Sequence, residues 1–159
     1  MFDVRSFFAA LRGRGAPGNP SPGEAALARG DAATALAEFA AAEAAAPDDV
    51  TRARLANKRG VAHVRDGDRD RALEAFARAL VLDERCAPAI TNLGNLLYED
   101  GHAHDAIDYY RAAIRVDDVY ALAHQNLGVA LKSLGRHGEA VRSLRTATRL
   151  AAKRRASKS

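Results

Sequence analysis

The histidines are the residues of this chain best suited to bind a metal ion. The sequence contains five, of which His102 and His104 are separated by a single residue and His137 comes later. Zinc sites in proteins use three or four protein ligands, and a His-x-His pair without a third ligand does not meet this need. The spacing therefore predicts no metal site, and we expect His63 to be a packing residue with a hydrogen-bonded ring nitrogen.

Cysteine usage and the lack of catalytic motifs argue against an enzyme. Cys86 is the only cysteine, which excludes an internal disulfide and any Cys-x-x-Cys redox or zinc site, and fits a reducing compartment. The sequence holds no Gly-x-Ser-x-Gly and no His-Glu-x-x-His motif. We therefore predict a protein of the cytoplasm that has no catalytic activity and no cofactor.

Positive charge is concentrated at the C-terminal end. The formal net charge is +4, from 24 basic and 20 acidic residues. The last 18 positions hold no acidic residue and seven basic residues: Arg142, Arg145, Arg149, Lys153, Arg154, Arg155 and Lys158. Residues 1–141 therefore carry a net charge of about −3. Clustered Lys and Arg can contact nucleic acid or an anionic membrane, although no aromatic residue is interleaved to stack on bases. We favour the alternative that these charges complement a helix dipole and keep this end soluble.

A repeat of 34 residues positions all of these side chains. Five sets of similar residues are spaced 34 apart: Gly60, Gly94 and Gly128; Gly67, Gly101 and Gly135; Ala72, Ala106 and Ala140; Phe76, Tyr110 and Leu144; Ala79, Ala113 and Ala147. A fixed period in this range is typical of solenoids built from stacked helical pairs. With Leu93-Gly94 followed by Ala106-x-x-x-Tyr110, the chain resembles the tetratricopeptide repeat family over about residues 16–152.

This resemblance implies an all-α fold, a right-handed α-solenoid of antiparallel helix pairs with about four repeats, of which the first is degenerate. The expected units are an N-terminal amphipathic helix and linker at 1–15, repeats at about 16–49, 53–86, 87–120 and 121–152, and a basic tail at 153–159. One helical pair cannot bury its apolar faces alone, so stability must come from stacking of neighbouring repeats.

The central repeat shows what each recurring position of the pattern should do. Gly94 and Ala106 are small enough to let the two helices approach, and Tyr110 fills the space beside them. Gly101 should end the first helix in the left-handed conformation that other residues adopt at a cost. Ala113 is the expected contact with the following repeat.

The N-terminal segment before the repeats has two parts. Residues 2–12 place Val4, Phe7, Phe8 and Leu11 on one face of a helix. We favour a helix that caps the open end of the solenoid, and the alternatives are a membrane-surface helix or a segment that binds a groove of this or another copy. The stretch Gly13–Gly23 is rich in Gly and Pro and predicts a flexible joint.

The first repeat is the irregular one. Its first helix should be short and lacks the Leu-Gly pair, and its markers Gly30 and Phe39 precede Gly67 and Phe76 by 37 residues. The three extra residues predict a longer loop or a lengthened helix near Asp48–Arg52.

The resemblance also implies a site, because proteins of this family bind partner segments in a concave groove lined by the first helix of each repeat. Carried over position by position, the groove residues are Arg54, Asn57, Lys58, Thr91, Asn92, Asn95, Tyr98, Gln125, Asn126, Val129 and Lys132. Amide side chains both donate and accept hydrogen bonds, so they can pair with an extended backbone of any sequence.

Arg54 and Lys58 lie one helical turn apart and could hold a carboxylate. Some co-chaperones of this family clamp a carboxylate end with two basic residues at these places, together with Lys and Asn from the two preceding repeats. Only one degenerate repeat precedes Arg54 here, so we favour a solvated basic face.

The expected function is that of a non-catalytic adaptor or scaffold that binds a protein or peptide partner of unknown identity. One alternative is a substrate-recruiting arm related to those of O-linked glycosyltransferases, without the catalytic domain, for which 159 residues leave no room. Another is a peripheral membrane or nucleic-acid factor that acts through the N-terminal helix or the tail. No apolar run is long enough to predict a spanning helix.

Overall fold

The computed structural model describes residues 20–157, and every regular element within this range is an α-helix. The helices are α2 Pro22–Ala28, α3 Ala32–Ala45, α4 Asp49–Asp66, α5 Arg69–Leu82, α6 Ala87–Glu99, α7 Ala103–Val116, α8 Ala121–Ser133 and α9 His137–Ala156. The predicted N-terminal amphipathic helix at 2–12 and most of the predicted glycine-rich joint lie outside the described residues.

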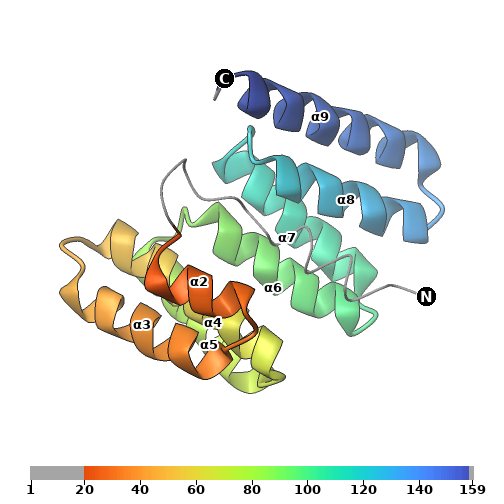
Figure 1. The fold of residues 1–159 in the computed structure, drawn as a ribbon. Helices are drawn as coiled ribbons and strands as arrows, with labels where there is room; N and C mark the ends of the chain where they lie inside the picture. The colour runs from red at the N-terminus through yellow and green to blue at the C-terminus, as the bar shows by residue number, and fades with distance from the viewer. Residues whose placement is uncertain (1–19, 158–159) are drawn as a thin grey trace.

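Consecutive helices form hairpins that stack in chain order, from α2 and α3 at one end to α8 and α9 at the other (Figure 1). Each hairpin joins a first helix (α2, α4, α6 or α8) to a second helix (α3, α5, α7 or α9). Apolar residues of successive hairpins share continuous clusters; in one of them Ala113 of α7 packs with Ala87 of α6 and Ala123 of α8. The predicted all-α solenoid, including the role of Ala113 between repeats, is confirmed.

Four glycines end the first helices in the left-handed conformation. Gly30, Gly67, Gly101 and Gly135 have φ angles of 82°, 82°, 85° and 73°. Apart from the glycine itself and its two chain neighbours, no residue has a heavy atom within 4 Å of the place where a Cβ would stand on any of them, so the backbone conformation and not the available space requires glycine. The prediction for Gly101 is confirmed.

A second set of glycines brings the two helices of each hairpin together. A Cβ on Gly94 would lie 2.8 Å from Cε1 of Tyr110, and one on Gly60 would lie 2.3 Å from Cε1 of Phe76. Gly23 has the same role, because its Cβ would lie 2.6 Å from Cε1 of Phe39. The assignment of Gly23 to a flexible joint is therefore wrong: it is buried within α2.

The 37-residue spacing of the first repeat is absorbed by a lengthened helix. Helix α4 has 18 residues, whereas α6 and α8 have 13 each. It begins directly after Asp48, whose carboxylate accepts a hydrogen bond from the backbone N–H of Thr51 at 2.7 Å. Such a cap satisfies an N–H group that the helix itself leaves unpaired. Helix α2, with 7 residues, is short as expected.

Candidate partner-binding face

Amide side chains connect the three long first helices in a ladder. The Nδ2 of Asn92 on α6 donates to Oδ1 of Asn57 on α4 at 2.8 Å. On the other side of α6, Oδ1 of Asn95 accepts a hydrogen bond at 2.8 Å from Nδ2 of Asn126 on α8. Within α6, Asn95 donates to Asn92 at 3.3 Å, and the hydroxyl of Tyr110 donates to Oδ1 of Asn95 at 2.9 Å. We call these four asparagines the amide ladder.

The centre of the ladder is buried, which corrects the prediction that Asn92 and Asn95 line a partner-binding groove. Asn92 is 6% exposed and Asn95 is 4% exposed. Buried amides are stable only when they are hydrogen bonded, and here they satisfy each other across the helices. Burial also raises the pKa of Tyr110, so its hydroxyl remains a donor to Asn95. Asn92 and Asn95 therefore belong to the packing of the repeats.

Thr91 is wrong as a groove residue. It is completely buried, and its Oγ1 donates to the carbonyl oxygen of Ala87 at 2.9 Å. A threonine hydroxyl readily bonds to the carbonyl four residues earlier in a helix, which lets this polar group enter the core.

The other predicted residues remain accessible on the same three helices. Three are exposed and five are half-buried, and we call these eight residues the first-helix face: Arg54, Asn57, Lys58, Tyr98, Gln125, Asn126, Val129 and Lys132. They combine the exposed polar ends of Arg54, Gln125 and Lys132 with the apolar surface of Tyr98 and Val129, a mixture that can contact both the backbone and the side chains of a bound segment.

Lys58 already has a partner within the chain. Its Nζ lies 2.8 Å from Oε1 of Glu24 on α2 and 5.8 Å from the centroid of the Phe39 ring. The hydrogen bond from Lys58 holds the pKa of Glu24 below its ordinary value. A carboxylate clamp formed by Arg54 and Lys58 would have to displace Glu24, and Lys58 is not the freely solvated cation that we expected.

His63 differs from the expectation for its ring. The side chain is buried, at 8% exposed, and its Nδ1 has no hydrogen-bond partner among residues 20–157. Burial lowers the pKa of His63, which favours the neutral ring. Within the described range, no three His, Cys, Asp or Glu side chains are grouped so that they could hold a metal ion.

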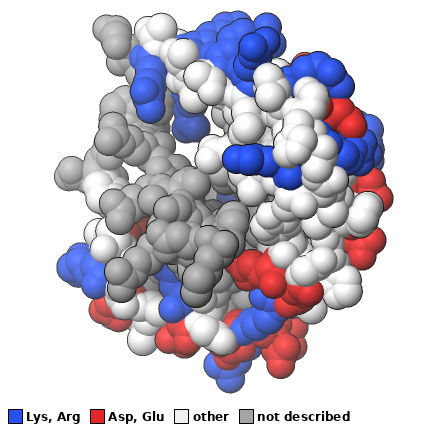
Figure 2. All heavy atoms as spheres, turned by 90° about the vertical axis from the view of Figure 1, so that its right-hand side faces the viewer, with Lys and Arg blue, Asp and Glu red and all other residues white. Residues whose placement is uncertain are grey.

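The basic tail begins inside the last helix. Helix α9 continues to Ala156, so Lys153, Arg154 and Arg155 lie in its last turn, where positive charge is favourable to the helix dipole. Lys and Arg gather at the end of the molecule formed by α9, at the top of Figure 2, whereas both signs mix at the opposite end. None of the described helices is both long and apolar enough to cross a membrane.

Deleting Lys153–Ser159 should leave nucleic-acid and liposome binding as low as in the intact chain, because the charges of the last turn serve the helix. Fluorescence anisotropy with a labelled oligonucleotide and co-sedimentation with anionic liposomes measure this at about 0.15 M salt. Circular dichroism checks that the shortened α9 remains folded. Tight, salt-sensitive binding that disappears on deletion would instead assign the tail a direct role with phosphates.

Sequence comparison agrees with this architecture. A family model described as tetratricopeptide repeat matches residues 91–155, which contain most of α6 and all of α7 and α8 and nearly all of α9. Residues 91–155 therefore belong to the tetratricopeptide repeat family. A search of curated proteins found no significant match.

Solved structures extend the similarity over most of the tetratricopeptide solenoid. A crystal structure of MamA matches with a TM-score of 0.57 and 21% identity, covering 83% of this chain and 95% of that one. A second MamA structure has a TM-score of 0.54 at 21% identity and covers 83% and 89% of the two chains. The second tetratricopeptide domain of Spaghetti (RPAP3), bound to the HSP90 peptide SRMEEVD, has a TM-score of 0.57 and 26% identity, covering 62% of this chain and 85% of that one. The MamA structures support the fold alone at this level of identity.

Proposed function

We propose that this tetratricopeptide repeat protein is a non-catalytic adaptor that binds an extended segment of a partner protein along the first-helix face. Its repeats form a protein-interaction module. The amide ladder is the observation that carries the proposal, because it holds α4, α6 and α8 at fixed spacing through bonds of 2.8 Å on either side of α6. A prepositioned surface binds with a smaller loss of conformational entropy than a flexible one.

The residues beside the ladder have the chemistry that such binding requires. Gln125 and Lys132 are exposed on α8 and present hydrogen-bond donors, while Tyr98 and Val129 offer apolar surface. The similarity to a tetratricopeptide domain of RPAP3 that was solved with a peptide supports a peptide-like partner. The proposed place of action is the cytoplasm, where a single reduced cysteine is ordinary.

The test of this proposal must spare the amide ladder. Replacing Asn95 would leave the hydroxyl of Tyr110 and the Nδ2 of Asn126 without their acceptor, at a cost of about 1–3 kcal/mol, so lost binding would be confused with lost stability. Gln125 and Lys132 are exposed and suit the purpose better.

Gln125→Ala combined with Lys132→Ala should weaken a partner by about 5- to 150-fold if both side chains contact it, because each lost hydrogen bond is worth about 0.5–1.5 kcal/mol net. The partner is first identified by affinity capture from the native cell and mass spectrometry. Isothermal titration calorimetry with the purified partner then gives the dissociation constants, and melting followed by circular dichroism should be unchanged.

A matched control removes two exposed side chains from second helices, Glu38→Ala on α3 with Glu74→Ala on α5. This variant should bind as tightly as the wild type. Equal affinity of the Gln125 and Lys132 variant, together with a clear loss on removing residues 2–12 or the tail, would place the partner elsewhere and leave the repeats as a spacer.

A further inference from the structure

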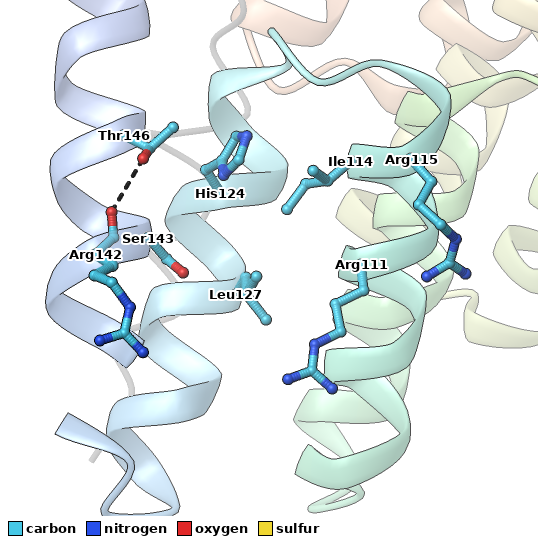
Figure 3. A pocket seen from close by; sticks show the side chains of 8 residues that line it. All are labelled: Arg111, Ile114, Arg115, His124, Leu127, Arg142, Ser143 and Thr146. Carbon is cyan, nitrogen blue, oxygen red and sulfur yellow. Dashed lines mark hydrogen bonds between the residues drawn. The ribbon is translucent and has the colours of Figure 1, made fainter. Parts of the chain in front are cut away.

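A pocket lies on a different side of the last repeats, between α7 and α9 and above α8. Its volume is about 410 Å³, and its apolar part is formed by Ile114 of α7 and Leu127 of α8. Arg111 and Arg115 of α7 lie along one side and Arg142 of α9 along the other (Figure 3). Ser143 of α9 also lines it. Cations therefore surround an apolar centre.

The repeat period shows that packing does not require these cations. Shifting by 34 residues, the places of Arg111, Arg115 and Arg142 are taken in the preceding repeats by Ala77, Val81 and Asp108. Val81 is 86% exposed, so this position accepts a neutral side chain without any structural role for charge.

The same comparison explains why the pocket is open. Ser143 stands where the preceding repeat has Tyr109, whose Cβ would lie 3.0 Å from a Cβ on Gly94. A tyrosine at position 143 would occupy space that the serine leaves empty. At this pocket, the last two repeats therefore carry more positive charge than the equivalent place one repeat earlier, and a smaller side chain at position 143 than the Tyr109 found there.

Nearby carboxylates neutralise the pocket only in part. Glu139 is bound by Arg136 through two contacts of 2.8 Å, and its distance to Arg111 is longer, at 3.6 Å. Asp108 lies 3.8 Å from Arg111 and is itself well exposed. Arg115 and Arg142 form no salt bridge with any residue of the range 20–157. Donors that lack a close acceptor are available to a ligand with carboxylates.

We propose that this pocket is a second docking site, which takes an acidic segment of a partner protein that presents one large apolar side chain between carboxylates. The apolar side chain would enter between Ile114 and Leu127, and the carboxylates would meet Arg111 and Arg142, which approach that space from opposite helices (Figure 3). A nucleic acid fits less well, because no phenylalanine, tyrosine or tryptophan lines the pocket to provide a stacking platform for successive bases. The site is separate from the first-helix face, so one chain could hold two partners.

Fluorescence anisotropy tests this with the intact chain and a labelled peptide, Asp-Glu-Leu-Glu-Asp. Arg111→Gln with Arg142→Gln should weaken the peptide about tenfold or more, because both charge-assisted contacts are lost. Ser143→Tyr should also weaken it by filling the pocket, with a side chain that the equivalent position of this chain already accommodates. The control, Arg145→Gln with Arg149→Gln, also removes two positive charges, but from α9 outside the pocket, and should have little effect on the affinity.

Two further probes separate specific docking from simple attraction. Replacing the peptide's leucine by alanine should weaken binding, and a labelled oligothymidylate should not compete. The proposal is overturned if the peptide fails to bind, if the pocket variants bind it like the wild type, if the alanine peptide binds equally well, or if the oligonucleotide displaces it. Gln125→Ala with Lys132→Ala should leave this peptide's affinity unchanged, which separates the site from the first-helix face.

Discussion

Replacing Glu43 by Gln should be among the most destabilising single changes in this protein. Glu43 is 5% exposed near the end of α3 and accepts from Arg59 of α4 at 2.9 Å and from Arg78 of α5 at 2.7 Å. Removing one partner from a buried ion pair costs about 3–5 kcal/mol, because the other charges stay without compensation. The side chain of Arg78 is 56% exposed and can be rehydrated, so we expect a loss near the lower end. Urea denaturation followed by circular dichroism measures it.

The same cluster predicts a dependence on pH. Burial raises the pKa of Glu43, but the hydrogen bonds and charges of Arg78 and Arg59 lower it more, so the folded pKa lies below its ordinary value. A carboxyl group with a depressed folded pKa stabilises the protein fully above its unfolded pKa of about 4.3, and this contribution disappears as the pH falls through the folded pKa. The stability gap between wild type and Glu43→Gln should therefore be widest at neutral pH and narrow below about pH 4.

A matched control is Glu38→Gln, an exposed carboxylate on the same helix, which should change stability by less than about 0.5 kcal/mol. If Glu43→Gln unfolds at the same urea concentration as this control at neutral pH, the ion cluster does not hold the first two repeats together.

The repeat period offers a sharper version of this experiment. Glu43 and Arg59 stand where the following repeats have Leu80 with Leu93 and Ile114 with Leu127. Apolar residues of similar volume often replace a buried ion pair without loss of stability. The double change Glu43→Leu with Arg59→Leu should thus be much less destabilising than the sum of the two single changes, and additive effects would contradict a direct interaction.

The backbone of the fold could be predicted from the sequence because glycine has few substitutes at two kinds of position: turns with positive φ and close contacts between the helices of a hairpin. Gly67, Gly101 and Gly135 recur where the chain turns with positive φ, and they located the ends of the first helices. Gly23 was misassigned because prolines surround it. Its distance of 16 residues from Phe39 equals that from Gly60 to Phe76, and this spacing was the signal that could have placed it in the core.

The candidate site was less predictable, since position along a helix does not reveal what an amide bonds to. Asn95 and Asn126 occupy places where a side chain can reach either a partner or the neighbouring helix, and the structure shows that they bond to each other. The ion cluster joins Arg59 to Glu43, which only the stacking of α3 on α4 brings near. The charged pocket likewise depends on two helices separated by a third.

Gly60→Leu should also destabilise the protein strongly. Even a single Cβ at this position would lie 2.3 Å from Cε1 of Phe76 and 2.5 Å from Cδ1, closer than carbon atoms can approach, so α4 and α5 would have to separate. Overpacking of this kind costs about 1–3 kcal/mol and occasionally more, and a leucine adds three further carbons. Thermal melting followed by circular dichroism should show a large decrease in the melting temperature.

A graded series makes this result specific to the contact between the two helices. Gly60→Ala and Gly94→Ala should both destabilise, with Gly60→Ala the worse of the two because the Cβ contact on Gly94 is looser, at 2.8 Å. Gly138→Ala is the matched control: it lies in α9, its Cβ would meet nothing closer than Nη1 of Arg142 at 3.9 Å, and alanine is favoured over glycine in a helix by up to about 1 kcal/mol. Helix propensity alone would stabilise all three variants, so destabilisation confined to positions 60 and 94 isolates the packing. Gly60→Ala melting at or above the wild-type temperature would show that Phe76 can move aside, and that this glycine does not set the distance between α4 and α5.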